Sequence, residues 1–384
     1  MNDKRDILHD EGIEFYEQNN FKTLFTLPTG TGKSVITIKI LKKYPGKYLL
    51  VTPTILLHKR NWKAEFEKHS SLEMYDNLTR CCYVSLHKYD LNEFDGIIFD
   101  EAHHLSVRQY NLLRRYLHLF KKDDLHSKKV IALTATPGKY GFTQRVLREI
   151  VGNAVFNYKL DEAADNQMVN NFKIHVIYTK LDNITKNSKA GSKEKPFLTT
   201  EKSNYDYLTK VINELKEEIK TSSGMVKYLS KYQMYIRKRA KLLYDLQSKI
   251  LSVKQFLIKL DNEQPLAKTI IFARTIDVAE QLEKRSIHSK SKEDFIAPFI
   301  EGKINRISSV DMLLEGMNLS KVEIGIMTSP PSERKFIQSL GRCLRNDVDK
   351  ISHYYIFCVK DTVEEDWLKT AIEDISQEKI IYEN

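Results

Sequence analysis

The stretch TLFTLPTGTGKSVITIKIL constrains the fold more than any other part of the chain, because an apolar run, a glycine-bearing turn and a helical pattern follow one another in it. Gly30 and Gly32 let the backbone turn tightly with its N–H groups directed inward, and the following helix adds the positive end of its dipole. Such a loop binds phosphate groups, and it needs a strand before it and a helix after it. The chain is therefore predicted to contain an α/β domain that binds a nucleotide.

The phosphate-binding loop consists of Leu27, Pro28, Thr29, Gly30, Thr31, Gly32, Lys33 and Ser34. We expect Lys33 to reach the β- and γ-phosphates of a triphosphate and the hydroxyl of Ser34 to bind Mg²⁺. Leu27 stands where this motif usually has glycine or alanine. The alternative, a chance G-x-G-K-S sequence in a turn, does not account for the strand and helix patterns on either side.

Short apolar runs of strand length recur in two parts of the chain. The first series is TLFTL, KYLLVTP, RCCYVSL, DGIIFDE, KVIALTATP and AVFNYKL, and the second is KTIIFART, RISSV, EIGIMTS and HYYIFCV. Turn or helical patterns follow these runs, which is typical of parallel sheets with crossover helices. Between the two series, residues 183–204 predict a mobile loop and residues 205–260 a long helical stretch. We therefore expect two α/β domains, 1–165 and 263–384, joined by a loop and a basic helical linker or insertion, 166–262.

The run DGIIFDEAHH contains a second candidate group of catalytic residues. In it, Asp100 and Glu101 directly follow an apolar strand pattern. Carboxylates at the carboxyl end of a parallel strand face the same crevice as the phosphate loop. We expect Asp100 to bind Mg²⁺ and Glu101 to orient and deprotonate an attacking water, which favours hydrolysis over transfer. The alternative is two solvated acids at the start of the next helix. His103 and His104 are adjacent and lack a third ligand, so we do not expect zinc.

The net charge of +10 is concentrated in one part of the chain. Residues 180–260 hold 18 Lys and Arg against 8 Asp and Glu, so the remainder is close to neutral. This basic block indicates a polyanionic partner, usually nucleic acid, and the alternative is a solvated helical face. Its densest cluster is Arg237, Lys238, Arg239 and Lys241, which we expect to contact phosphates. Tyrosines at helical spacing beside the cluster would either stack on unpaired bases or form core.

Composition excludes several other classes of protein. No apolar run approaches the roughly 18 residues that span a bilayer, and the start of the chain, MNDKRDILHDEG, is not a signal segment. The four cysteines (Cys81, Cys82, Cys343 and Cys358) lack zinc-binding spacing, and free thiols are typical of a reducing cytoplasm. We expect a cytoplasmic protein with no membrane partner, and its abundant Lys, Ile, Asn and Tyr indicate a bacterial or viral genome.

Eight motifs occur in one order: LPTGTGKS, VTPTILL, YVSLHK, IIFDEAHH, LTATP, TIIFARTIDVAEQL, SSVDMLLEGMNL and FIQSLGRCLR. With them the chain resembles superfamily 2 helicases and translocases, and within these the D-E-A-H-H branch of restriction-enzyme motor subunits and phage DNA helicases. The resemblance covers residues 24–137 and 268–345. It implies an α/β protein of two RecA-like domains, with ATP and Mg²⁺ in the cleft, nucleic acid across the top, and DNA favoured over RNA.

The resemblance also implies roles for single residues. Contacts to the nucleic-acid backbone are implied for Thr52, Pro53, Thr54, Ser85 and Ser309. Roles in linking nucleotide state to strand position are implied for His103, Thr134 and Thr136. Glu315 and Gly316 belong to the motif that meets both ligands. Trp62 fits a family position as a packing residue.

The segment FIQSLGRCLR places Gln338, Arg342 and Arg345 on one face of a helix, with no acidic residue from Ser339 to Asn346. The resemblance implies that the two arginines are fingers for the γ-phosphate held by the other domain, with Gln338 beside them. Fingers of this kind stabilise charge that develops in the transition state, and they act when the cleft closes.

Two further positions depart from the family pattern. The segment KRDILHDEGIEF offers His9 where a glutamine usually reads adenine, so adenine specificity is not implied by this position. Asn318 stands where an aspartate is usual, which weakens the case for a ribose contact. ATP remains the expected nucleotide.

The residues favour an ATP-dependent motor that moves along or unwinds nucleic acid. The alternative from another class is a nucleotide-gated switch or subunit that binds nucleic acid and recruits partners without unwinding. The intact Lys33, Asp100 and Glu101 argue against that alternative, and the short chain leaves room for protein partners that supply specificity. A phosphate-loop enzyme acting on small molecules would leave the motifs of the second domain unexplained.

Overall fold

The computed structural model forms two compact units. It describes residues 4–55, 57–120, 127–135, 142–191, 194–221, 225–291, 293–310, 319, 322–332, 336–337, 339–341 and 351–383. Of these, the first unit contains residues up to Asn171 together with Leu319 and the segment 336–341, and the second contains the rest. Each unit is described by itself below.

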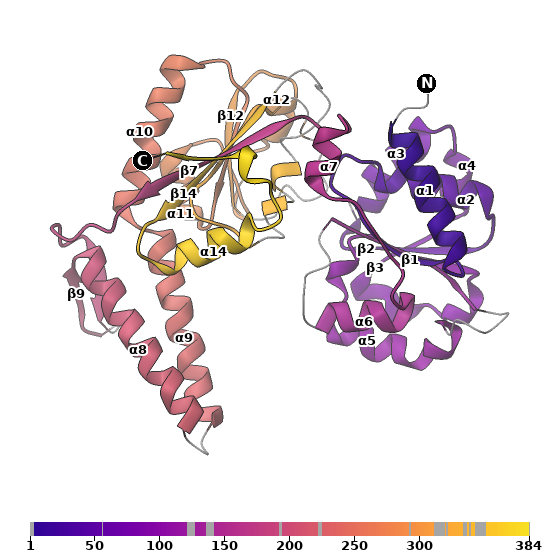
Figure 1. Ribbon diagram of the computed structural model, residues 1–384, viewed down its shortest axis with the longest axis horizontal. Helices are drawn as coiled ribbons and strands as arrows, with labels where there is room; N and C mark the ends of the chain where they lie inside the picture. Colours follow the sequence, from indigo (N-terminus) through magenta and orange to yellow (C-terminus); the bar gives the residue numbers. More distant parts are fainter. Residues whose placement is uncertain are drawn as a thin grey trace. The chain divides into compact units, whose positions relative to one another are not determined.

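A six-stranded sheet forms the centre of the first unit (Figure 1). Its strands, in spatial order, are β3 (Thr79–Cys82), β2 (Tyr48–Thr52), β4 (Gly96–Phe99), β5 (Lys129–Thr134), β1 (Lys22–Thr26) and β6 (Val155–Asn157). Every neighbouring pair is parallel. Because parallel strands end at the same edge, the segments that follow β1, β2, β4 and β5 all leave the sheet on one side.

Helices cover both faces of this sheet (Figure 1). Those on one face are α1 (Lys4–Gln18), α2 (Lys33–Lys43), α3 (Lys63–Lys68) and α4 (Leu72–Asn77), and those on the other are α5 (Val107–Leu113) and α6 (Phe142–Val151). Shorter turns complete the unit: a π-helix η1 (Leu57–Trp62), the 3₁₀ segments η2 (Tyr83–Lys88), η3 (Leu91–Glu93), η4 (Ala102–His104) and η5 (Arg114–Phe120), and helix α7 (Leu160–Asp165).

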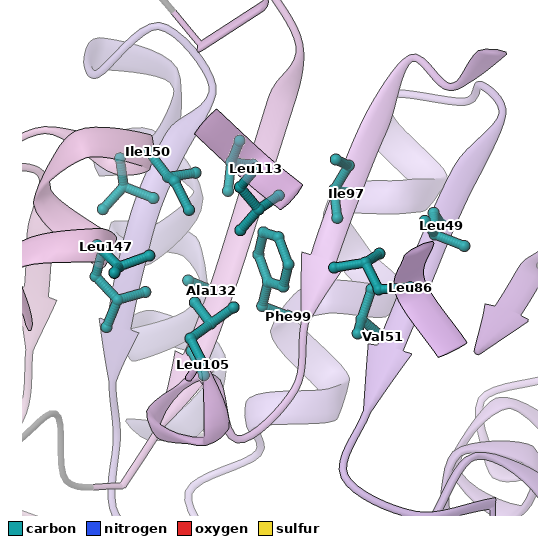
Figure 2. Close-up of a cluster of buried hydrophobic side chains, with 14 of the residues drawn as sticks. Leu49, Val51, Leu86, Ile97, Phe99, Leu105, Leu113, Ala132, Leu147 and Ile150 are labelled. Atoms are coloured by element: carbon teal, nitrogen blue, oxygen red, sulfur yellow. The ribbon is translucent and has the colours of Figure 1, made fainter. Parts of the chain in front are cut away.

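Figure 2 shows the core between the sheet and helices α5 and α6. Alternate residues of neighbouring strands point into it, among them Val51, Phe99 and Ala132, and they meet Leu113 and Leu147 of the helices. The strand residues between them, such as Leu50 and Ile98, are equally buried on the opposite face. Burial on both faces is the reason why these strands are continuous apolar runs in the sequence rather than alternating ones.

The second unit is built on a seven-stranded sheet. Its strands, in spatial order, are β11 (Ser286–Ile287), β12 (Arg306–Val310), β10 (Thr269–Ala273), β13 (Ile324–Met327), β14 (Ser352–Val359), β7 (Phe172–Thr179) and β15 (Ile380–Glu383). Every neighbouring pair is again parallel. Helices α10 (Gln247–Glu263), α11 (Ile276–Leu282), α12 (Ile296–Ile300) and α14 (Val363–Ala371) and the turn η7 (Gln377–Lys379) accompany it. The prediction of two parallel-sheet α/β domains is confirmed.

Helices α8 (Glu201–Thr221) and α9 (Met225–Tyr244) lie side by side and extend away from the sheet of the second unit (Figure 1). The base of this pair is apolar: Tyr205, Leu243 and Leu246 form a buried cluster with Val359 at the end of β14. Beside it, Lys249 of α10 forms a buried ion pair with Glu364 at 2.8 Å. The helical pair is thus anchored in the second unit at one end only.

Three features of residues 166–262 differ from our expectation. Strand β7 was not expected, and it joins the second sheet between β14 and β15. Residues 183–204, expected to be a loop, contain an antiparallel hairpin of β8 (Ser188–Gly191) and β9 (Pro196–Thr199). The long helical stretch is divided into α8, α9 and α10. Periodicity alone did not show the break between α9 and α10, because Leu243, Leu246 and Ile250 continue the helical spacing across it.

Candidate nucleotide-binding and hydrolysis site

The phosphate-binding loop connects β1 to α2 at the carboxyl edge of the first sheet. Gly30 and Gly32 have φ values of 96° and 94°, in the left-handed region that residues with side chains rarely adopt. A Cβ atom at Gly32 would lie 2.6 Å from Nε2 of His9, so space also requires glycine there. The local structure of the predicted motif, strand then tight loop then helix, is therefore present.

Lys33 is the first residue of α2, and its side chain reaches back across the loop. Its Nζ atom donates a hydrogen bond of 3.0 Å to the carbonyl oxygen of Leu27. The Leu27 side chain is fully buried, and its N–H donates to the carbonyl oxygen of Thr134 at 3.0 Å. The unusual leucine therefore contributes to the core, and its backbone ties the loop to the end of β5. Ser34 follows in α2 and is half-buried.

His9 on α1 holds the loop from the side. Its Nε2 atom lies 2.9 Å from the carbonyl oxygen of Thr31, whose hydroxyl donates to the carbonyl oxygen of Pro28 at 2.8 Å. Burial lowers the pKa of His9, so the neutral ring donates its Nε2–H to Thr31. The residue at the position usual for the adenine-reading glutamine thus contacts the phosphate loop itself.

Asp100 lies at the end of β4 and is held by two aromatic residues. The indole N–H of Trp62 donates to Oδ2 of Asp100 at 2.7 Å, and the hydroxyl of Tyr83 donates to its carbonyl oxygen at 2.9 Å. Burial raises the pKa of the Asp100 carboxyl to about 7, and the negative charge of Glu101 adds to this effect. The Trp62 hydrogen bond and the Lys33 ammonium act in the opposite direction and lower the pKa. A buried carboxylate of this kind is suited to a cation that compensates its charge.

Glu101, His103 and Thr134 connect the ends of two strands, β4 and β5. Glu101 has a φ of 48°, an unusual value for a residue with a side chain, and such strain is concentrated at functional sites. Its Oε2 atom lies 3.4 Å from Nδ1 of His103, and the same ring nitrogen lies 3.0 Å from the hydroxyl oxygen of Thr134. Because Thr134 also accepts the Leu27 N–H, a continuous set of contacts leads from the acidic pair to the phosphate loop.

The segment after β2 contains the residues expected to touch nucleic acid. Thr54 is exposed and Pro53 is half-buried, whereas Thr52 is fully buried. The Thr52 hydroxyl donates to the carbonyl oxygen of Thr54 at 3.0 Å and lies 3.0 Å from Nδ1 of His58. Thr52 therefore shapes the loop, and Thr54 is the member of the three that is open to a ligand. Ser85 lies in η2 and is half-buried.

The described residues 336–337 and 339–341 belong to the first unit, where Gly341 approaches the phosphate loop. A Cβ atom on Gly341 would lie 2.6 Å from the Cβ of Thr29, so the glycine permits this approach. Phe336 and Leu340 are fully buried and secure the segment. The predicted site residues Thr136, Glu315, Gly316, Gln338, Arg342 and Arg345, and the departure Asn318, lie outside the described residues.

The remaining predicted residues belong to the second unit. Ser309 is fully buried on β12. On α9, Lys238, Arg237 and Lys241 are exposed and line a shallow groove of about 410 Å³ with Ser230, Gln233 and Met234. Arg239 differs, because its guanidinium lies 5.8 Å from the ring centroid of Tyr205 and donates to the Thr209 hydroxyl at 3.3 Å. Arg239 thus faces α8, and the other three form the exposed basic face of α9.

The sequence did not reveal how Trp62 and Tyr83 function in the site. We expected Trp62 only to pack, and it does pack on Phe66, but it also donates a hydrogen bond to Asp100. Thirty-eight positions separate Trp62 from Asp100, so no spacing rule links them. The closest signal was the position of Trp62 shortly after a predicted strand.

No group of three or more His, Cys, Asp or Glu side chains that could hold a metal ion occurs in the described part of the chain. Magnesium bound by one carboxylate and phosphate oxygens does not need such a group. Among the described helices, none combines the length and apolar composition of a membrane span.

Two family models match the chain. The model described as "Type III restriction enzyme, res subunit" matches residues 4–79 and 70–139, and the "Helicase conserved C-terminal domain" matches residues 248–347. The chain is an ATP-hydrolysing helicase or translocase of superfamily 2. These matches favour a motor over the recruiting subunit without unwinding activity, and they confirm the resemblance to restriction-enzyme motor subunits.

A curated relative of this helicase is the DNA 3'-5' translocase XPB2 of Sulfurisphaera tokodaii. The two are 25% identical over 348 residues, which cover 84% of this chain and 74% of the relative. Two solved structures share the fold. The Hef helicase domain of Pyrococcus furiosus has a TM-score of 0.52 at 16% identity, with 96% of this chain and 99% of that chain covered. The ATP-dependent Type ISP restriction-modification enzyme LlaBIII bound to DNA has a TM-score of 0.59 at 14% identity, with 100% of this chain and 31% of that chain covered.

Proposed function

We propose that the protein is a DNA motor whose ATP hydrolysis takes place at the carboxyl edge of the first sheet. The observation that supports this most directly is the chain of contacts from Lys33 and Leu27 of the phosphate loop through Thr134 and His103 to Glu101. Through these contacts, the presence or absence of the γ-phosphate at the loop would affect the residues at the ends of β4 and β5. DNA is favoured as the polymer because the curated relative is a DNA translocase.

The roles of the residues follow from their chemistry. Lys33 would bind the β- and γ-phosphates, and Glu101 would orient the attacking water and accept its proton. Ser34 and Asp100 would hold Mg²⁺, which when bound supplies positive charge to the phosphate oxygens. The buried carboxyl of Asp100 and the adjacent phosphate loop fit this cation, since magnesium prefers oxygen ligands.

Arg342 and Arg345 would complete the site as arginine fingers, with Gln338 beside them. The approach of Gly341 to Thr29 supports this proposal, because Gly341 directly precedes Arg342 in the chain. Glu315 and Gly316 would act from the preceding motif. Hydrolysis would then depend on residues that the sequence separates by more than 300 positions from Lys33.

The nucleic acid would contact Thr54 and the exposed basic face of α9. The face consists of Arg237, Lys238 and Lys241 and can neutralise phosphates without reading sequence. Ser85 and Pro53 would contribute near Thr54. The buried Thr52 would act through the Thr54 backbone that it positions, and the buried Ser309 through its own backbone. Half-buried tyrosines on α9 share a stripe with Arg239 and the buried Leu243, which favours their alternative role in packing.

Protein partners would supply target specificity. The restriction-modification enzyme LlaBIII is a much longer chain, of which this chain covers 31%, so a similar fold occurs there beside further parts. We also place the protein in the cytoplasm of a bacterium or of a virus-infected cell. The buried free cysteines Cys81, Cys82 and Cys358 fit a reducing compartment.

The ATPase rate tests this function, measured without polymer and with single-stranded DNA, duplex DNA and RNA. We expect DNA to stimulate the rate and Lys33→Ala and Glu101→Gln to abolish it. A rate that none of the polymers changes would refute the motor. A larger stimulation by RNA than by DNA would refute the DNA preference alone.

A further inference from the structure

Trp62 makes a contact that packing does not explain. Its side chain is only 2% exposed, and its single polar atom, Nε1, lies 2.7 Å from Oδ2 of Asp100. A buried indole N–H needs an acceptor, but any carbonyl would satisfy it. Here the acceptor is the carboxylate proposed to hold Mg²⁺. A charge-assisted hydrogen bond of this length restricts the rotation of the carboxylate as well as satisfying the indole.

The segment that carries Trp62 is itself unusual. Leu57–Trp62 forms a π-helix, a rare conformation that occurs mostly as single turns and is frequent at functional sites. The six-residue turn runs directly into α3, whose Phe66 packs on Trp62 with ring centroids 6.2 Å apart. Phe66 in turn packs on Tyr75 of α4 at 5.6 Å. The indole is therefore held in place by a buried aromatic cluster, Trp62–Phe66–Tyr75.

Asp100 is fixed from two sides by this arrangement. Tyr83, buried with its ring stacked on Phe99, donates its hydroxyl to the Asp100 backbone oxygen at 2.9 Å. Trp62 donates to the side chain. The tyrosine thus sets the position of the strand end, and the tryptophan sets the orientation of the carboxylate.

We propose that Trp62 is a positioning residue for metal binding: its indole N–H orients the Asp100 carboxylate toward the Mg²⁺ that accompanies ATP. The inference rests on the proposed function, since it takes Asp100 to be the metal-binding carboxylate. Groups that hydrogen-bond a metal ligand in this way orient the ligand, and their removal typically reduces metal affinity by about 10–100-fold.

The first test compares Trp62→Phe with Tyr75→Phe. Phenylalanine keeps an aromatic ring at position 62 but removes the N–H. Tyr75→Phe is the matched control, since it removes one buried hydrogen bond, 2.7 Å to the His58 carbonyl oxygen, from the same aromatic cluster without touching Asp100. We expect Trp62→Phe to raise the Mg²⁺ concentration for half-maximal ATPase activity about tenfold. Tyr75→Phe should leave it within about twofold.

A second test leaves Trp62 unchanged and does not depend on turnover. The chain has two tryptophans, Trp62 and Trp367, and Trp367 lies in α14 of the second unit. In Trp367→Phe, all tryptophan fluorescence comes from the indole beside Asp100. We expect Mg²⁺, added to the ADP-bound protein, to change this emission with a midpoint that moves to higher concentration in Asp100→Asn. The test remains decisive if Trp62→Phe fails to fold.

The outcomes separate this inference from the proposed function. A folded Trp62→Phe with an unchanged Mg²⁺ midpoint, or an emission of Trp62 that ignores Mg²⁺, would overturn the inference. If Asp100→Asn kept normal Mg²⁺-dependent ATPase activity, the metal assignment of the proposed function would fail instead. An increase in the Mg²⁺ midpoint in both Trp62→Phe and Tyr75→Phe would indicate general loosening of the aromatic cluster and also overturn the inference.

Discussion

The hydrolysis site and the basic face of α9 hold their charged groups in opposite ways. Lys33 is hydrogen-bonded within the phosphate loop, Asp100 and His103 contact partners on other elements, and Asp100 is only 8% exposed. Arg237 and Lys241 on α9 project into solvent along a single helix. Stabilising a transition state requires groups already fixed at low dielectric, whereas binding a phosphate backbone requires only accessible positive charge. A single substitution in the hydrolysis site should therefore cause a large loss of ATPase activity. Each substitution on the basic face of α9 should weaken DNA binding by a smaller amount.

The largest effect is expected at the acidic pair. Glu101→Gln should reduce the ATPase rate by about a thousandfold or more while ATP binding persists, because the amide cannot accept the proton of the attacking water. Steady-state kinetics and nucleotide titration measure the two quantities. Glu149→Gln, at an ion-paired surface position on α6, is the control and should keep the wild-type rate. Wild-type turnover in Glu101→Gln would contradict the assignment.

A smaller effect, on stability, should follow from the burial of Asp100. The pKa of this carboxyl is about 7 in the folded protein against 3.8 unfolded. The folded state thus binds more protons between these values, and the free energy of unfolding falls as pH rises through them. Asp100→Asn should remove this loss of stability and raise the free energy of unfolding by up to about 4 kcal/mol at pH 8, but not at pH 4.

Thermal unfolding without nucleotide, in the presence of a chelator, measures this difference across the pH range. Asp95→Asn serves as a control, because Asp95 lies just before the same strand and its carboxylate accepts the Lys47 backbone N–H. A melting temperature of Asp100→Asn that parallels the wild type at every pH would show that the buried charge has no cost.

On the basic face, the combined change Arg237→Glu, Lys238→Glu and Lys241→Glu should weaken DNA binding by about tenfold or more. The slope of log affinity against log salt should fall by up to about 3 for single or duplex DNA, because fewer counterions are released. Fluorescence anisotropy at several salt concentrations gives both values. The control reverses Lys202, Lys210 and Lys220 on α8, whose charges are paired with neighbouring acids. Equal losses in both variants would contradict a specific face.

The smallest effect is expected for Arg239→Ala. Its guanidinium packs over Tyr205 and bonds to Thr209, so its loss should destabilise the α8–α9 pair by about 1 kcal/mol. DNA affinity should change less than for Arg237→Ala, since Arg239 is turned toward α8. Urea unfolding measures the stability of the two variants, and DNA titration measures their affinity. A greater loss of DNA affinity in Arg239→Ala than in Arg237→Ala would contradict the assignment of Arg239 to packing and of Arg237 to DNA binding.

Much of the fold could be predicted because strands buried on both faces leave continuous apolar runs, as in YLLVT and GIIF. The phosphate loop was equally visible, since Gly30 and Gly32 adopt backbone angles that few other residues tolerate. Strand β7 was missed although the alternation in FKIHV is itself a strand signal, because the run lies outside both series of apolar runs, in the part of the chain assigned to the linker. The hairpin β8–β9 was missed because its two strands have four residues each and carry glycine and proline, which are typical of turns.

The sequence by itself determined the type of chemistry: the lysine, the acidic pair and the glycines of the loop, each recognisable because local spacing constrains it. Only the tertiary structure decided which distant residues serve these groups. Trp62 is hydrogen-bonded to Asp100, His9 is hydrogen-bonded to Thr31, and Arg239 packs on Tyr205 instead of facing solvent with the other basic residues of α9. The physical reason is that a motif is held by backbone geometry over a few residues, whereas a hydrogen bond between elements depends on how the sheet brings separate segments together.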